Sequence, residues 1–164
     1  VDGGWRLFDT GRDDWHLTLP ASEIDGLSLT VNAGEGRIDL ADTRIGLLEV
    51  TTNAAQTSVD LSGASLASLS GTVNAGRLSF RLPATADVVG SIDVNAGQLQ
   101  VCVPSELGIS VHQRGALSGV SVNGLHQTGT DWQSPNYASA AHHADLNVSA
   151  NLGSVEINPI GGCK

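Results

Sequence analysis

The stretch that decides the fold is a ten-residue pattern that occurs four times. It reads VNAGEGRIDL over 31–40, TNAAQTSVDL over 52–61, VNAGRLSFRL over 73–82 and VNAGQLQVCV over 94–103. Successive copies begin 21 residues apart. A fixed period of this length is typical of repeat proteins, in which similar units stack on one another.

Each copy alternates apolar and polar side chains after its turn residues. One apolar column contains Ile38, Val59, Phe80, Val101 and Val122. A second contains Leu40, Leu61, Leu82 and Val103. This period of two predicts a half-buried β-strand. Another apolar set, Leu27, Leu29 and Val31, precedes the first asparagine, so we expect two strands in each repeat.

The tripeptide between the two strands is expected to form a corner. Asn and Gly tolerate left-handed backbone conformations. The predicted structural corners are Asn32, Asn53, Asn74 and Asn95. Because such a unit cannot bury its apolar face alone, the sequence predicts an all-β fold, a single-domain β-solenoid. It would be β-helix-like, with about 21 residues per coil and capped ends.

The division of the chain follows from where the period breaks. The next comparable strand, GSVEI at 153–157, lies 35 residues beyond the last copy of its column. We therefore predict one domain, 1–164, in four parts. These are an N-terminal cap with the first strands (1–26), regular coils (27–125), an insertion loop (126–143), and a final coil with a tail (144–164).

Composition excludes several classes of function. The 164 residues carry a net charge of −9, which opposes binding to nucleic acid. No apolar run is long enough to span a bilayer, so membrane helices are absent from this fragment. Because the sequence contains no methionine, we expect it to be part of a longer precursor.

The C-terminal half, from about Leu99 to Asn158, resembles the toastrack domains of bacterial membrane proteins of the LiaF and PspC type and related adhesin-like domains. The resemblance rests on Val103-Pro104, Ser118-Gly119-Val120, Ser134-Pro135-Asn136-Tyr137 and Gly153-Ser154-Val155. Two motifs differ from the family pattern in residue order: Ser-Gly replaces Gly-Ser, and Pro-Asn replaces Asn-Pro.

The resemblance implies an extracytoplasmic module of the bacterial cell envelope that is tethered through a missing membrane segment. We expect a non-enzymatic role in protein interaction, scaffolding or envelope-stress sensing, with an envelope or membrane protein as partner and no cofactor. The alternative is a polysaccharide-binding or carbohydrate-active solenoid with a glycan ligand. A homo-oligomer that forms through open coil edges is a third hypothesis.

The insertion carries the candidate interaction surface: Trp132, Pro135, Asn136 and Tyr137. Exposed aromatic side chains favour recognition of sugars or proteins. The competing interpretation, which we favour, is that Trp132 and Tyr137 cover an open edge of the solenoid. Trp5 and Trp15 would do the same at the other end.

Other candidate chemistry is weaker. Asp39 and Asp60 would stack as paired carboxylates, but Arg81 follows them in the column and favours a solvated face. The adjacent pair His142 and His143 lacks metal-ligand spacing, so we predict no metal site and no catalytic residues.

The two cysteines, Cys102 and Cys163, form either a disulfide that pins the C-terminus or two free thiols.

Overall fold

The computed structural model describes residues 23–115 and 119–162. In these ranges the chain forms twelve β-strands and no helix, which confirms the all-β prediction. It follows that no helix in the described ranges could cross a membrane.

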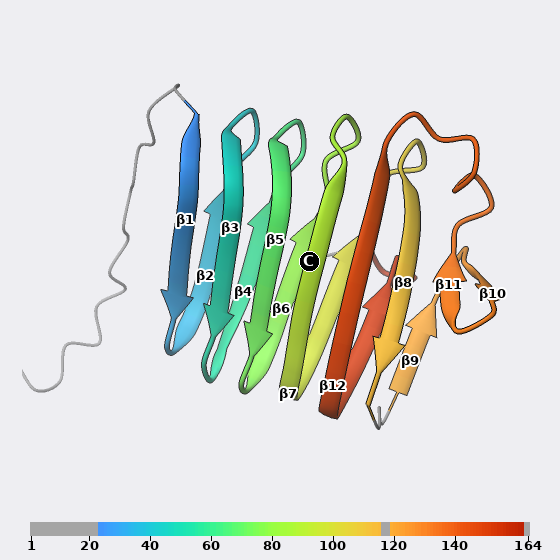
Figure 1. Cartoon of the computed structure of the whole chain (residues 1–164). Helices are drawn as coiled ribbons and strands as arrows, with labels where there is room; N and C mark the ends of the chain where they lie inside the picture. Colours follow the sequence, from blue (N-terminus) through green and yellow to red (C-terminus); the bar gives the residue numbers. More distant parts are fainter. Residues whose placement is uncertain (1–22, 116–118, 163–164) are drawn as a thin grey trace, which may run out of the picture.

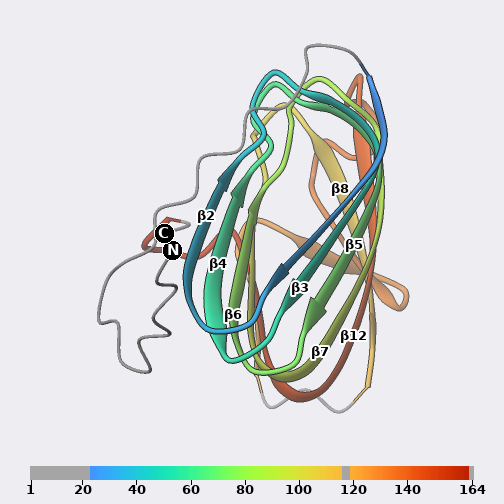
Figure 2. The same ribbon diagram turned by 90° about the vertical axis from the view of Figure 1, so that its left-hand side faces the viewer.

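The strands form two layers that face each other (Figure 2). The first layer contains β1 (Ile24–Val31), β3 (Arg44–Thr52), β5 (Ser65–Val73), the first half of β7 (Val88–Cys102), the first half of β12 (His143–Ile157) and β8 (Gly108–Arg114). The second contains β2 (Gly34–Asp39), β4 (Ala55–Asp60), β6 (Gly76–Arg81), the second halves of β7 and β12, and β9 (Gly119–Val122). A short hairpin, β10 (His126–Thr128) and β11 (Asp131–Gln133), follows β8 at the end of the first layer.

The first three coils stack in the order of the sequence. Val59 pairs with Ile38 on one side and with Phe80 on the other, in parallel strands. The registers therefore have the 21-residue step of the sequence pattern. Side chains of this column point between the layers, where Val59 and Phe80 are at most 2% exposed.

The four asparagines of the pattern lie at one corner and form a ladder. The Nδ2 group of Asn53 donates to Oδ1 of Asn32 at 3.0 Å. Asn74 donates to Asn53 at 2.6 Å, and Asn95 donates to Asn74 at 2.7 Å. Close approach of the backbones needs glycine here: a Cβ on Gly97, whose φ is +140°, would lie 2.3 Å from the carbonyl oxygen of Gly76.

The last strand does not form the final coil, and this expectation was wrong. Val101 pairs with Ile157, and Ile157 pairs in turn with Val122, so β12 lies between β7 and the β8–β9 coil (Figure 1). In this place both edges of β12 are hydrogen-bonded, and Leu146 fills a notch at Gly90, where a Cβ would be 2.5 Å from its Cδ2 atom.

Candidate functional site

The predicted aromatic surface is built into a cap. Trp132 lies on β11, which pairs with the outer edge of β8 through Trp132 and Val111. Its half-buried ring packs against the hydrophobic core. Trp132 therefore helps to cover the edge that β8 would otherwise present to solvent.

The loop after β11 is held by specific hydrogen bonds. The Tyr137 hydroxyl donates to Oδ1 of Asp145 at 2.7 Å, and this bond raises the pKa of Tyr137 to about 12. The Tyr137 ring also meets the ring of His143 edge to face, with centroids 5.1 Å apart. Asn136 donates from Nδ2 to the carbonyl oxygen of Ser105 at 3.0 Å, whereas Pro135 is exposed.

The histidines pair with single carboxylates. His142 and His143 both lie near Asp87, with ring nitrogens 3.6 and 4.0 Å from its Oδ1 atom. The ring of His112 contacts Oδ1 of Asp131 at 2.5 Å, and this hydrogen bond lowers the pKa of Asp131. Within residues 23–115 and 119–162, no three His, Cys, Asp or Glu side chains gather to hold a metal ion.

The carboxylates of Asp39 and Asp60 lie in one column and accept hydrogen bonds from the turns that follow them. Asp39, Asp60 and Arg81 are neighbours in register, and Arg81 lies 3.6 Å from the Asp60 carboxylate. The backbone N–H groups of Ala41 and Ser62 donate to Asp39 and Asp60 at 3.0 and 2.9 Å. Hydrogen bonds from Ser62, with Arg81 nearby, lower the pKa of Asp60. Both carboxylates thus stabilise turns, and Asp60 also pairs with a cation.

Three sequence predictions fall on positions outside the described ranges. Cys102 ends β7, but Cys163 lies outside the described residues, so the pairing of the two cysteines stays a prediction. Trp5 and Trp15, predicted to cap the other end, also lie outside them. The proposed N-terminal cap at 1–26 is therefore untested for all but its last residues.

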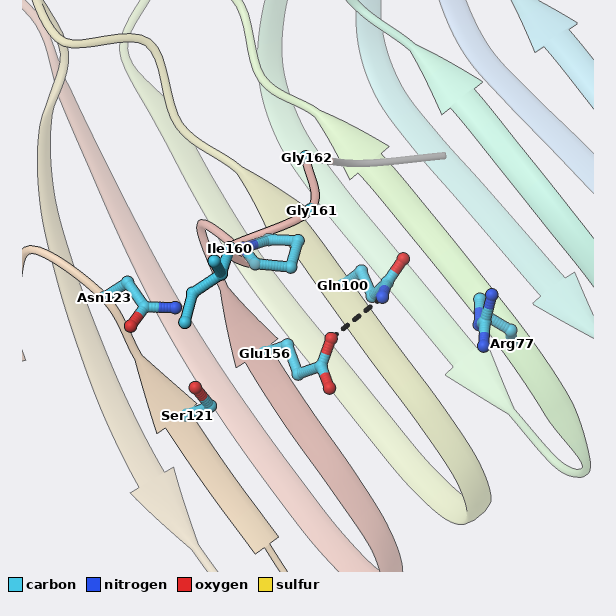
Figure 3. A pocket seen from close by; sticks show the side chains of 9 residues that line it. Arg77, Gln100, Ser121, Asn123, Glu156, Ile160, Gly161 and Gly162 are labelled. Atoms are coloured by element: carbon cyan, nitrogen blue, oxygen red, sulfur yellow. Dashed lines mark hydrogen bonds between the residues drawn. The ribbon is translucent and has the colours of Figure 1, made fainter.

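A hollow with polar side chains on its floor lies on the outer face of the second layer, and we call it the strap groove. Its volume is about 390 Å³, and it lies beneath the C-terminal segment 158–162, the strap (Figure 3). The lining residues are Arg77, Gln100, Ser121, Asn123, Glu156 and 159–162. The floor side chains come from the four neighbouring strands β6, β7, β12 and β9, together with Asn123 just after β9.

Asn158 anchors the strap where it leaves β12. Its backbone N–H donates to the carbonyl oxygen of Val101 at 2.8 Å, and its Oδ1 accepts from the backbone N–H of Val103 at 2.8 Å. Its carbonyl oxygen accepts from Nδ2 of Asn123 at 2.9 Å. A further bond, from Gly162 N–H to the Pro159 carbonyl oxygen at 2.8 Å, closes the strap as a turn.

The floor of the groove is a chain of polar contacts. The Ser79 hydroxyl donates to Oε1 of Gln100 at 3.2 Å. Nε2 of Gln100 in turn donates to Oε2 of Glu156 at 2.8 Å (Figure 3). Beside them, Nε of Arg77 donates to Oε1 of Gln98 at 2.7 Å. Among the described residues, neither Arg77 nor Glu156 forms an ion pair.

Sequence reasoning missed this groove because Gln100 and Glu156 are 56 residues apart and meet only through the placement of β12. A signal for that placement was present. Asn151 and Gly153 have the spacing of the Asn-Ala-Gly corner, and Asn151 donates to Oδ1 of Asn95 at 3.3 Å, which extends the asparagine ladder. The pattern continues at a step that is no multiple of 21, and a search at the fixed period overlooks it.

Comparison with known proteins agrees with the architecture. Residues 3–82 match the family model for the N-terminal domain of toast_rack, DUF2154. This match covers the N-terminal half, whereas the motifs that carry the sequence resemblance lie between Val103 and Val155. No curated protein matches the chain significantly.

A solved structure has the same fold. It is that of "a putative cell adhesion protein" from Clostridium sporogenes, with a TM-score of 0.65 at 14% sequence identity. The alignment covers 87% of this chain and 96% of the clostridial chain. Together with the family match over residues 3–82, this likeness supports a toastrack-like all-β domain.

Proposed function

We propose that the protein is a non-enzymatic β-solenoid module that works outside the cytoplasm, at the bacterial cell envelope, as a binding or scaffolding unit for a partner protein. Its coils would have about 21 residues each, and the β10–β11 hairpin would cap one end. The toastrack match supports this proposal, as does the adhesion function for which the clostridial protein is named. Tethering through a membrane segment is part of the same proposal.

The observation that carries the proposal is the outer face of the first layer. Parallel strands present its side chains in straight columns, and many of these side chains are short hydroxyls, such as Ser28, Ser70 and Thr72. Two exposed apolar residues lie in one column: Leu47 is 39% and Val89 is 58% exposed, and Ser68 pairs with both. A flat face with apolar contacts among polar ones suits association with another protein.

The distribution of ionisable groups supports a non-enzymatic role. The described groups with a clearly shifted pKa are Asp60, Asp131 and Tyr137. In each case the largest cause is a hydrogen bond with one structural partner, Ser62, His112 or Asp145. Asp60 lines a second hollow together with Asp39 and Arg81, whereas Asp131 and Tyr137 line neither this hollow nor the strap groove. The three groups therefore share no cleft, although perturbed groups in an active site tend to do so.

The test is a pull-down from envelope extracts with three folded variants. Changing Leu47 and Val89 together to Glu should abolish recovery of a specific partner protein. Leu152→Glu is the matched control, because Leu152 is 73% exposed at a different place and should leave recovery unchanged. If the wild-type domain recovers no specific protein, or the double variant recovers the same one, the proposed surface is wrong.

A third variant tests the cap. Trp132→Ala with Tyr137→Ala addresses the candidate interaction surface of the insertion. Since both side chains are engaged in the cap, we expect lower stability with the partner retained. Loss of the partner from a domain whose circular dichroism is unchanged would instead assign recognition to the insertion.

Light scattering over a range of concentrations on the same samples tests homo-oligomer formation.

A further inference from the structure

We propose that the strap groove is a glycan-binding site that takes a neutral, polyhydroxylated segment of a polysaccharide, with Glu156 and Arg77 as its principal hydrogen-bonding partners. This inference goes beyond the proposed role in protein binding, since it concerns the second layer and not the first. It therefore stands or falls independently of that role.

The shape of the groove fits an extended ligand that crosses the strands. Arg77, Gln100, Glu156 and Ser121 come from four successive strands of the second layer (Figure 3). Because neighbouring strands lie about 4.8 Å apart, the floor extends over roughly 14 Å. Its volume of about 390 Å³ falls within the range of small-ligand sites. A few sugar units in a row would therefore contact successive strands.

The open hydrogen-bonding positions fit hydroxyl groups. Glu156 uses Oε2 for Gln100, which leaves Oε1 as an acceptor, and Arg77 uses Nε for Gln98, which leaves its two terminal nitrogens as donors. A hydroxyl both donates and accepts, so hydroxyls of successive sugar units can satisfy the carboxylate on β12 and the guanidinium on β6. Hydrogen bonds to charged groups are stronger than those between neutral groups.

The groove is held in one shape before any ligand arrives. Gln100 is only 8% exposed, Ser79 only 3%, and the bonds between Ser79, Gln100 and Glu156 fix the carboxylate. The three bonds at Asn158 fix the base of the strap. A site ordered in advance loses less conformational entropy on binding, which matters for a ligand that offers mainly hydrogen bonds.

Charge and backbone pairing favour a neutral glycan over other ligands. A polyanion would be repelled by the net charge of −9, and the groove itself holds one charge of each sign, Glu156 and Arg77, which suits a neutral ligand better than a charged one. An extended peptide that binds by strand addition needs a free sheet edge. The groove lies on a face instead, where β6, β7 and β12 are paired on both sides; among the described strands that line it, β9 at its end is paired with β12 alone.

The experiment uses the full chain on an array that carries many neutral and acidic glycans, followed by titration of the strongest neutral glycan. Glu156→Gln and Arg77→Gln should each weaken its binding about tenfold or more, as expected for loss of a charged hydrogen bond. Glu49→Gln and Arg114→Gln make the same charge changes on exposed residues of the first layer and should change affinity less than twofold. Circular dichroism verifies the fold of each variant.

A nuclear magnetic resonance titration locates the contact. The neutral glycan should shift amide signals of β6, β9, the second halves of β7 and β12, and the strap. Three results would overturn the inference: no neutral glycan retained on the array, binding of acidic glycans alone, or equal affinity of the groove variants and their controls. Because the pull-down variants alter the first layer, they report separately on the protein partner.

Discussion

The first three coils and the last three follow different rules. From β1 to β6, each strand pairs with the strand that comes 21 residues later. Beyond β7, the order in space is β7, β12 and then β8 with β9, so a strand from the end of the chain enters the stack. Its registers are 56 residues from β7 and 35 residues from β8 and β9.

The difference shows how a regular stack can admit a remote strand. β12 offers the same features as the local repeats: an inward apolar column, an asparagine at the corner and a glycine where backbones approach. A Cβ on Gly153 would lie 2.5 Å from the carbonyl oxygen of Gly97, which is the close approach found at Gly97 itself. A strand can therefore join the stack if its side chains and backbone groups fit the neighbouring strands, even when it is distant from them in the sequence.

The largest expected effect comes from the core of β12. Leu146 is 1% exposed, and Leu146→Ala should lower the free energy of unfolding by about 2–5 kcal/mol, because it leaves a cavity between buried neighbours. Leu48 of β3 is 0% exposed. If β12 contributes to stability as much as the sequential coils do, Leu48→Ala should lower the free energy of unfolding by the same amount. Urea denaturation measures both. The exposed Leu152→Ala is the control, and a loss below 1 kcal/mol for Leu146→Ala would mean that β12 is peripheral.

The next effect concerns the inserted corner. Gly153→Ala should cost about 1–3 kcal/mol, because the added methyl meets backbone and the Val94 side chain and must separate the strands. Gly119→Ala, on neighbouring β9, is a matched control, since its Cβ would meet only Ser154 at 3.8 Å. Thermal unfolding compares the two. Equal melting temperatures would contradict the close approach of β12 to β7.

A smaller effect is expected along the asparagine ladder. Asn74→Ala removes bonds to Asn53 and Asn95 at 2.6 and 2.7 Å and should cost about 1 kcal/mol, since net gains from exposed hydrogen bonds are modest. Asn151→Ala removes one longer bond, of 3.3 Å, and should cost less than half as much. Denaturant midpoints give both values. A larger loss of stability in Asn151→Ala than in Asn74→Ala would contradict this prediction and would mean that the ladder depends more on the inserted strand than on the repeats.

The smallest effect is a pH dependence of the cap. The hydrogen bond with His112 lowers the pKa of Asp131 in the folded protein, so its contribution to stability is present above the ordinary carboxyl pKa and is lost as the pH falls below that value and through the lowered pKa. Amide signals of β11 should therefore change on acidification before those of β3. Asp131→Asn should remove this difference between the two regions, and an unchanged pH profile in that variant would contradict the assignment.

The regular part of the fold could be predicted from the sequence because the residues that specify each strand and corner are close together in the chain. Alternation around Ile38 and Val59 predicts strands, and the asparagine with its small neighbours predicts the corner between them. The position of β12 could not be read in this way. Its alternation predicts a strand, but which edge it joins depends on competition among all free edges and on notches such as Gly90, which form only when the coils are assembled.

The same distinction between local and distant information applies to the candidate site. The aromatic residues of the insertion stand out by composition, yet in the structure Trp132 and Tyr137 are used to hold the cap. Gln100 and Glu156 are ordinary polar residues in the sequence and become the floor of the strap groove only because their strands are neighbours. A residue's type is visible in the sequence, whereas its partners are not.

The sequence by itself determined the strands, the 21-residue step and the corners, because side-chain alternation and turn chemistry act over a few residues. Only the tertiary structure decided the coil order and the groove. Pairing across 56 residues is selected by the shape and hydrogen bonds of a stack that must already exist, and so Glu156 lies beside Gln100.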